Sequence, residues 1–172
     1  MKIGFIGLGI MGESMCKNIV KKHNDQVFVF DFVEAKVKQL ESVGAVGCTS
    51  SKEVAEHADV IISMVPKSEH SRSVYQEILP VLDASKTCID MSTIDPSVSV
   101  EISRMVKATG AQFIDAPVVK SKPAAIAGKL GIYVGGIIGA VMLLTVSPMD
   151  ALIYVIILEV LHQIESNFIY PK

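Results

Sequence analysis

The chain opens with the stretch Lys2-Ile3-Gly4-Phe5-Ile6-Gly7-Leu8-Gly9-Ile10-Met11-Gly12. Its first half is a short apolar run of strand length, and its second half places three glycines in G-x-G-x-x-G order before a segment with helical periodicity. In this pattern the first glycine permits a tight strand-to-helix turn, the second lets a ligand approach the backbone, and the third lets the helix pack closely on the strand. Because free N–H groups at a helix start attract anions, the stretch predicts a site for the pyrophosphate of a dinucleotide. The residues expected to contact that dinucleotide are Gly7, Leu8, Gly9, Ile10, Met11 and Gly12.

An acidic residue at the end of the second expected strand supports this interpretation. The apolar residues 26–30 are followed by Asp31, about 20 residues beyond the last glycine, where a carboxylate binds the ribose hydroxyls of NAD. A surface aspartate that merely ends a strand is the alternative. Residues 32–36 contain no arginine that could bind the 2′-phosphate of NADP. The sequence therefore favours NAD over NADP.

Strand and helix patterns alternate along the rest of the first 136 residues. Residues 60–65 form a nearly continuous apolar run, which is typical of a strand buried on both faces. Ser50-Ser51-Lys52-Glu53 has the form of a capping box and predicts a helix through Ala58. This alternation predicts an α/β fold with a doubly wound parallel sheet. Further helices are expected near residues 11–22, 34–42, 68–79 and 96–109, and further strands near 45–47, 87–91, 112–116 and 130–134, with a Pro/Ala/Gly-rich connection before the last strand.

The composition bounds the class of protein. With 172 residues, half of them hydrophobic, the chain is long enough for one domain of ordinary size. Its formal charge of −2 and the lack of a basic run give no reason to expect nucleic acid or an anionic membrane surface as a partner. The cysteines are scattered without C-x-x-C spacing and the histidines share no spacing, so we expect buried thiols in a reducing compartment and no metal site. Because the first strand begins at residue 2 or 3, we expect a cytoplasmic protein or, alternatively, a mitochondrial matrix protein written without its leader.

From Ile137 onward the sequence consists mainly of apolar runs and no longer alternates between strand and helix patterns. Residues 137–146 and 151–158 are apolar runs separated by Ser147-Pro148-Met149-Asp150. Neither run reaches the about 18 consecutive apolar residues that a membrane helix needs, so we expect no membrane span. Left uncovered, these runs expose more apolar surface than a monomer in water usually tolerates. We therefore predict self-association, such as a homodimer, through residues 137–161.

Five motifs resemble those of one enzyme family. They are Phe5 to Met15, Met64-Val65-Pro66, Met91-Ser92-Thr93-Ile94-Asp95-Pro96, Asp115-Ala116-Pro117-Val118, and Leu130 to Gly136. Together they resemble the β-hydroxyacid dehydrogenase family over residues 1–136. The resemblance implies a Rossmann-like NAD-binding domain in an oxidoreductase of valine degradation that transfers hydride between a short β-hydroxyacid and NAD. It also implies that Met64, Val65, Pro66 and Thr93 lie on the nicotinamide side and that Val119, Lys120 and Ser121 occupy the substrate-binding turn.

Two residues in these motifs have simpler alternative roles. Thr93 could instead cap a helix or sit in a turn. Asp115 lies at a strand end, where an aspartate often does no more than fix a turn.

The chain departs from the family in two places. The family has Ser-Gly-Gly where this chain has Val119-Lys120-Ser121, and the β-branched and long side chains restrict the turns that glycine allows. Lys120 could bind a carboxylate by its charge or be a solvated surface lysine. The family also takes the hydroxyl proton with a lysine on a helix beyond the nucleotide-binding domain, and this chain has no lysine between Lys129 and Lys172. The catalytic residues are therefore unassigned.

Two functional hypotheses follow, and a form attached to a membrane by the apolar tail is a third interpretation. In the first, residues 1–136 are the dinucleotide-binding domain of an NAD-dependent dehydrogenase, and a partner chain or missing sequence supplies the lysine. In the second, the chain is a truncated, noncatalytic NAD-binding module that associates through its apolar tail. In both, residues 137–172 are a divergent tail in place of the family's helical C-terminal domain.

Overall fold

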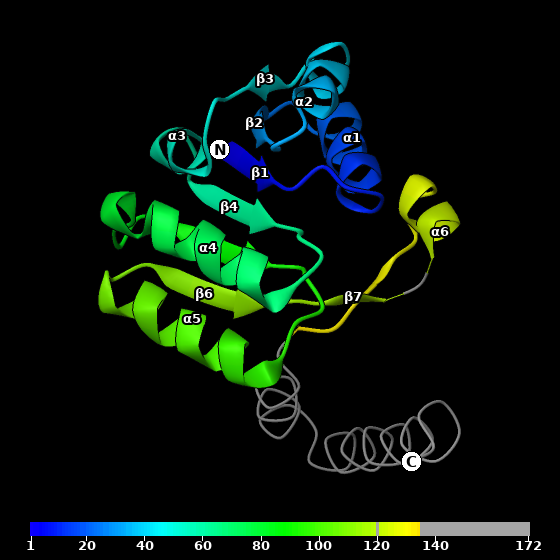
Figure 1. Cartoon of the computed structure of the whole chain (residues 1–172). Helices are drawn as coiled ribbons and strands as arrows, with labels where there is room; N and C mark the ends of the chain where they lie inside the picture. The colour runs from blue at the N-terminus through cyan, green and yellow to red at the C-terminus, as the bar shows by residue number, and fades with distance from the viewer. Residues whose placement is uncertain (120, 135–172) are drawn as a thin grey trace, which may run out of the picture. The chain divides into compact units, whose positions relative to one another are not determined.

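The expected parallel sheet is confirmed. The computed structural model describes residues 1–119 and 121–134, so the expectations for Lys120 and residues 137–172 lie outside the described residues. Six parallel strands lie in the order β3-β2-β1-β4-β5-β6 (Figure 1). The chain leaves β1 first toward β2 and β3 and later returns on its other side as β4. In such a sheet, ligands bind beyond the carboxyl ends of the strands at the point where this order reverses. The strands are β1 (Lys2–Ile6), β2 (Gln26–Phe30), β3 (Val46–Gly47), β4 (Val60–Ser63), β5 (Thr87–Asp90) and β6 (Gln112–Asp115).

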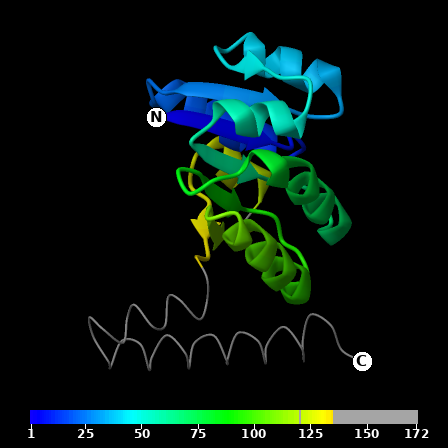
Figure 2. The ribbon, with the colours of Figure 1, turned by 90° about the vertical axis from the view of Figure 1, so that its left-hand side faces the viewer.

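Helices cover both faces of the sheet, as its strand sequences require. Alternate residues of β2 point to opposite faces: Val27 and Val29 belong to the hydrophobic cluster that α1 and α2 cover, whereas Phe28 and Phe30 belong to the cluster that α3, α4 and α5 cover. Figure 2 shows the green helices α4 and α5 side by side on the second face. Both faces are thus buried, which explains the nearly continuous apolar runs of the central strands. The helices are α1 (Gly12–Lys22), α2 (Glu34–Glu41), α3 (Ser51–His57), α4 (Ser68–Ile78), the 3₁₀ helix η1 (Leu79–Val81) and α5 (Pro96–Ala108).

The end of the described chain differs from the sequence-based expectation. The strand expected over 130–134 is reduced to β8 (Gly131–Ile132), which pairs antiparallel with β7 (Val118–Val119) in a separate two-stranded sheet. The Pro/Ala/Gly-rich connection contains the short helix α6 (Lys122–Ile126), which was not predicted from the sequence. Pro123 in its first turn and Gly128 just beyond its end are ordinary signals for a helix start and stop. At five residues, α6 is too short for hydrophobic periodicity to reveal it.

The start of α3 follows the capping box with one change. The hydroxyl oxygen of Ser50 accepts a hydrogen bond from the backbone N–H of Glu53 at 3.0 Å, as expected. The Glu53 carboxylate, however, accepts hydrogen bonds from the N–H and hydroxyl of Thr49, both at 2.6 Å, and so reaches one residue further back. The Glu53 carboxylate thereby satisfies both the N–H and the hydroxyl of Thr49.

Removing this cap should cost stability. We expect Ser50→Ala to lower the free energy of unfolding by about 1 kcal/mol, because the N–H of Glu53 loses its acceptor. Urea denaturation followed by circular dichroism measures the change. Ser73→Ala is the matched control, since Ser73 is exposed within α4, where alanine favours the helix. Equal destabilisation by both substitutions would contradict the assigned cap.

The three cysteines are buried, as the sequence predicts. Cys16, Cys48 and Cys88 are free and buried. Burial raises the thiol pKa to about 12 for Cys16, about 11 for Cys48 and about 12 for Cys88. Thiols of this kind behave as small apolar side chains and are poor nucleophiles.

Neither a membrane helix nor a metal cluster is found in the described part of the chain. Across residues 1–119 and 121–134, no helix is long and apolar enough to cross a membrane. The same residues contain no group of three or more His, Cys, Asp or Glu side chains able to hold a metal ion.

Candidate dinucleotide-binding site

The three glycines of the opening motif occupy three different environments. Gly7 has a φ of +94°, and a Cβ atom built on it would lie 2.3 Å from the carbonyl oxygen of Met64. A Cβ atom on Gly12 would lie 2.0 Å from the carbonyl oxygen of Gly7. On Gly9, by contrast, a Cβ atom would meet no protein atom within 4 Å. The first and third glycines therefore permit the turn and its packing, while the second leaves the backbone open to a ligand.

The start of α1 presents backbone donors beside this turn. In the described part of the chain, the N–H groups of Ile10, Met11 and Gly12 donate to no other residue, and Met11 offers no side-chain cap. Gly9 contributes its carbonyl, which accepts the N–H of Glu13 at 3.1 Å. Free N–H groups and the positive end of the helix dipole together suit a phosphate group.

Asp31 connects the end of β2 to the glycine turn. One carboxylate oxygen accepts the N–H of Leu8 at 2.7 Å, and the other accepts the N–H of Val33 at 2.8 Å. Each oxygen keeps a further lone pair, so the carboxylate can still accept hydrogen bonds from ribose hydroxyls. The spacing of the motif predicts the position of Asp31 but not its bond to Leu8. Leu8 is fully buried, so its contribution is the N–H that holds the Asp31 carboxylate in place.

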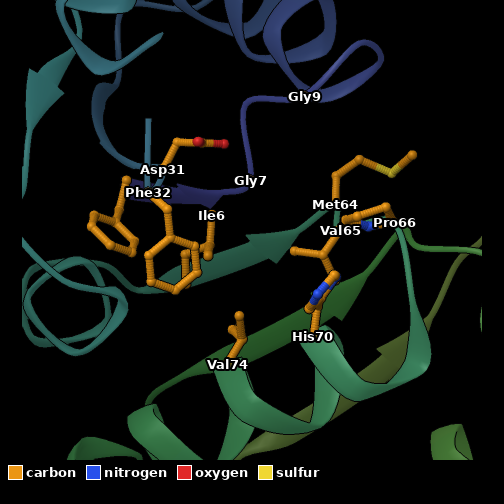
Figure 3. Close-up of a pocket in the computed structure, with 11 residues that line it drawn as sticks. Ile6, Gly7, Gly9, Asp31, Phe32, Met64, Val65, Pro66, His70 and Val74 are labelled. Atoms are coloured by element: carbon orange, nitrogen blue, oxygen red, sulfur yellow. The ribbon is translucent and has the colours of Figure 1, made fainter. Parts of the chain in front are cut away.

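A pocket of about 290 Å³ opens at the carboxyl ends of β1, β2 and β4 (Figure 3). Phe32 lies on the β2 side, with its side chain 86% exposed, while His70 and Val74 extend toward the same space from α4. The rings of Phe30 and Phe32 meet edge to face, with centroids 5.4 Å apart. These apolar walls, with the Asp31 carboxylate at the rim, suit a flat aromatic ring that carries a polar sugar. The lining residues are Ile6, Gly7, Gly9, Phe30, Asp31, Phe32, Met64, Val65, Pro66, His70 and Val74.

The structure brings together six of the residues expected from the sequence and leaves others outside the pocket. Gly7, Gly9, Asp31 and Met64-Val65-Pro66 line it, whereas Leu8, Ile10, Met11, Gly12 and Thr93 do not. Sequence reasoning missed the other five lining residues, which are Ile6, Phe30, Phe32, His70 and Val74. A phenylalanine directly after the strand-ending aspartate was a usable signal for Phe32, but the two α4 residues carry none.

A chain of hydrogen bonds fixes the turn that follows β4. The N–H of Val65 donates to the hydroxyl oxygen of Ser92 at 2.9 Å, and the N–H of Ser92 donates to the Asp90 carboxyl at 3.0 Å. The Ser71 hydroxyl donates to the other oxygen of Asp90 at 2.9 Å. Asp90, Ser92 and Ser71 are all buried. The network holds residues 64–66 against the segment that carries Thr93.

The alternative role of Thr93 as a helix cap is wrong. Asp95 caps α5, because its carboxylate accepts the N–H of Ser97 at 2.8 Å and the Ser97 hydroxyl at 2.6 Å. Thr93 is exposed and precedes this cap.

The substrate-side motif lies at the end of the sheet's last strand. Asp115 is opposite Asp90 in the register of β5 and β6. Burial and the neighbouring Asp90 raise the pKa of the Asp115 carboxyl, and a hydrogen bond from Ser99 partly offsets this. Val119 ends β7, and Ser121 precedes α6 without a side-chain cap bond. The described residues of this turn thus lie at the base of α6.

The parallel sheet, the glycine turn and the carboxylate after β2 define a Rossmann-like nucleotide-binding domain. Comparison with known families agrees. The family described as the NAD binding domain of 6-phosphogluconate dehydrogenase matches residues 2–145, and the chain belongs to this family. The resemblance to β-hydroxyacid dehydrogenases expected from the motifs is thereby confirmed.

Several individual relatives are named as dehydrogenases. The chain is 42% identical over 138 residues to mitochondrial 3-hydroxyisobutyrate dehydrogenase of Rattus norvegicus, covering 78% of this chain and 41% of that protein. Among solved structures, 3-hydroxyisobutyrate dehydrogenase of Mycobacterium tuberculosis with L-serine is 32% identical with a TM-score of 0.74, over 78% of this chain and 46% of that one. Psf3 in complex with NADP⁺ and 2-OPP is 28% identical with a TM-score of 0.73, over 77% and 48%. The chain thus spans less than half the length of these relatives.

Proposed function

We propose that this chain binds NAD in preference to NADP and forms the nucleotide-binding part of an oxidoreductase acting on a short β-hydroxyacid such as 3-hydroxyisobutyrate. The observation that carries the proposal is the glycine turn, whose Gly9 backbone is open to a ligand beside a pocket at the reversal point of the sheet. The rat and mycobacterial relatives add the dehydrogenase class. We expect the compartment to be cytoplasmic or, as in the name of the rat relative, mitochondrial.

The residues present suit each part of such a dinucleotide. The free N–H groups of residues 10–12 would bind its pyrophosphate. Asp31 would accept hydrogen bonds from the adenosine ribose, and the apolar pocket beside Phe32 would take the adenine. Residues 64–66 line the same pocket and would lead on, with Thr93, toward the nicotinamide side, with the substrate near residues 119–121.

Cofactor selection rests on individual side chains. The similar structure of Psf3 is a complex with NADP⁺, so this fold accommodates a 2′-phosphate in a relative. In this chain Asp31 occupies the end of β2, and residues 32–36 contain no arginine. A carboxylate repels a 2′-phosphate and accepts hydrogen bonds from a 2′-hydroxyl, which supports NAD.

Catalysis needs a group that this chain does not supply at a recognisable position. Bound NAD accepts a hydride, and a protein base must take the hydroxyl proton of the substrate. No lysine occurs between Lys129 and Lys172, where the family carries that base. We propose that a partner chain or further sequence provides it. The alternative is a noncatalytic NAD-binding module that associates through residues 137–161, and the missing lysine is the observation that favours it.

The role of Asp31 gives a direct test. We expect Asp31→Ala to weaken NADH binding about 10- to 100-fold, because the ribose loses its acceptor and Leu8 loses its partner. Titration of NADH fluorescence measures the dissociation constant, and circular dichroism verifies that the variant is folded.

A matched control lies at the opposite end of the sheet. The Asp59 carboxylate accepts the N–H of Lys2 at 2.8 Å, so Asp59→Ala also removes an aspartate bonded to the backbone of β1. This variant should bind NADH like the wild type. Equal affinities of the two variants for NADH would contradict the proposed ribose site.

A further inference from the structure

Lys36 is the one cation among the five residues that follow Asp31, and it is engaged by Glu13. Its ammonium lies 2.5 Å from one carboxylate oxygen of Glu13, while the ammonium of Lys17 lies 2.7 Å from the other. The side chain of Glu13 is only 19% exposed. Hydrogen bonds from Lys17 and Lys36 lower the pKa of Glu13, so this carboxylate is ionised at neutral pH. Both of its oxygens therefore accept bonds from cations.

The Glu13–Lys36 ion pair is linked to Asp31 through the start of α2. Glu13 is in the first turn of α1, where its N–H donates to the carbonyl of Gly9. Lys36 is in the first turn of α2, where its N–H donates to the carbonyl of Val33 at 2.8 Å. Val33 in turn donates its N–H to the Asp31 carboxylate. The ion pair thus joins the starts of the two helices that flank Asp31.

This arrangement bears on the 2′-position of a bound adenosine. A 2′-phosphate adds negative charge close to the Asp31 carboxylate, and binding it requires charge-assisted hydrogen bonds from a lysine or arginine. The flexible stem of Lys36 would allow its ammonium to serve that purpose. Glu13 opposes this role, since its carboxylate already occupies the Lys36 ammonium.

We propose that Glu13 is a specificity-determining residue, which holds Lys36 in an ion pair and thereby makes the site reject the 2′-phosphate of NADP. Glu13 acts through Lys36 and contacts no reacting atom, so its effect falls on the choice between two dinucleotides and not on a chemical step. The inference rests on the proposed function, because it requires the adenosine ribose to lie at Asp31.

The test compares dissociation constants for NADH and NADPH, measured by fluorescence titration. The wild type should bind NADH more tightly than NADPH. In Glu13→Gln, which keeps the shape of the side chain but releases Lys36, the ratio of the NADPH to the NADH dissociation constant should fall about tenfold. Adding Lys36→Met to that variant should restore the wild-type ratio. The gain in NADPH affinity in Glu13→Gln should also weaken as salt concentration rises.

A control and three contrary outcomes make the test decisive. Glu56→Gln makes the same charge change on α3 and releases Lys52 from an exposed ion pair of 3.8 Å, and it should leave the ratio unchanged. NADH binding with an unchanged ratio in Glu13→Gln would overturn this inference alone. A lowered ratio that persists without Lys36 would overturn it as well. Failure of the wild type to bind either dinucleotide would overturn the proposed function and, with it, this inference.

Discussion

Gly12→Ala should abolish measurable NADH binding, with a dissociation constant raised more than about 100-fold. The added methyl would lie 2.0 Å from the carbonyl oxygen of Gly7 and 3.2 Å from the ring of Phe5. Because the nearest atom belongs to the backbone, α1 or the glycine turn must move, and the N–H groups of residues 10–12 move with it. Helix propensity alone predicts the opposite, since alanine is favoured over glycine within a helix by about 1 kcal/mol. Fluorescence titration with NADH, alongside circular dichroism, measures the effect.

Gly9, the second glycine of the motif, is a position where the effect of a substitution on ligand binding can be measured apart from its effect on folding. Gly9→Ala introduces a methyl that meets no protein atom within 4 Å, so its melting temperature should equal that of the wild type. Any loss of NADH affinity in Gly9→Ala then reports contact with the ligand. If Gly12→Ala bound NADH as the wild type does, the packing of α1 on the glycine turn would not support the site.

Asp90→Ala should be among the most destabilising single substitutions in the described part of the chain. Asp90 is fully buried, and its carboxyl accepts hydrogen bonds from the N–H of Ser92 and the hydroxyl of Ser71. Alanine leaves both donors buried without partners. We expect the free energy of unfolding to fall by about 3 kcal/mol, even though removing the Asp90 carboxyl also removes its repulsion of Asp115. For a chain of this size the melting temperature should fall by about 10 °C. Thermal unfolding followed by circular dichroism measures it.

Asp83 is the control for Asp90, because it has the same kinds of hydrogen-bond partner but is exposed to solvent. The exposed Asp83 accepts hydrogen bonds from the N–H of Ser85 at 2.8 Å and from its hydroxyl at 2.5 Å. Asp83→Ala should change the melting temperature little, because water replaces both bonds. The melting temperature of Asp90→Asn should lie between those of Asp83→Ala and Asp90→Ala, since the asparagine side-chain oxygen still accepts the N–H of Ser92. Equal melting temperatures for Asp83→Ala and Asp90→Ala would contradict the role of burial.

Features encoded locally were accessible from the sequence. The glycine spacing, the apolar run ending at Asp31 and the alternation of elements define the parallel sheet and the place of its glycine turn. The capping box at Ser50 gave the start of α3. In each case a few neighbouring residues determine the backbone, so the pattern can be read without knowing what packs against it.

Contacts between distant segments were not accessible in the same way. The pocket needs His70 and Val74 from α4 opposite Phe32 from the end of β2, and no spacing links these segments. The hydrogen bonds from Val65 through Ser92 to Asp90 join strand ends that become neighbours only when the sheet forms. The pairing of Glu13 with Lys36 likewise depends on how α1 and α2 pack, since many surface lysines could serve an acidic partner. Sequence identifies such residues as polar but does not choose their partners.

The central claim is that the glycine turn and Asp31 bind a nicotinamide dinucleotide. Titrating the wild-type chain with NADH, and then adding NAD and 3-hydroxyisobutyrate while absorbance is read for new NADH, tests it most directly. We predict saturable NADH binding. Turnover in the second step would mean that a base is available to the site, and binding without turnover would favour the noncatalytic module. No NADH binding by the folded chain would contradict the account, because the glycine turn would then survive only as part of the fold.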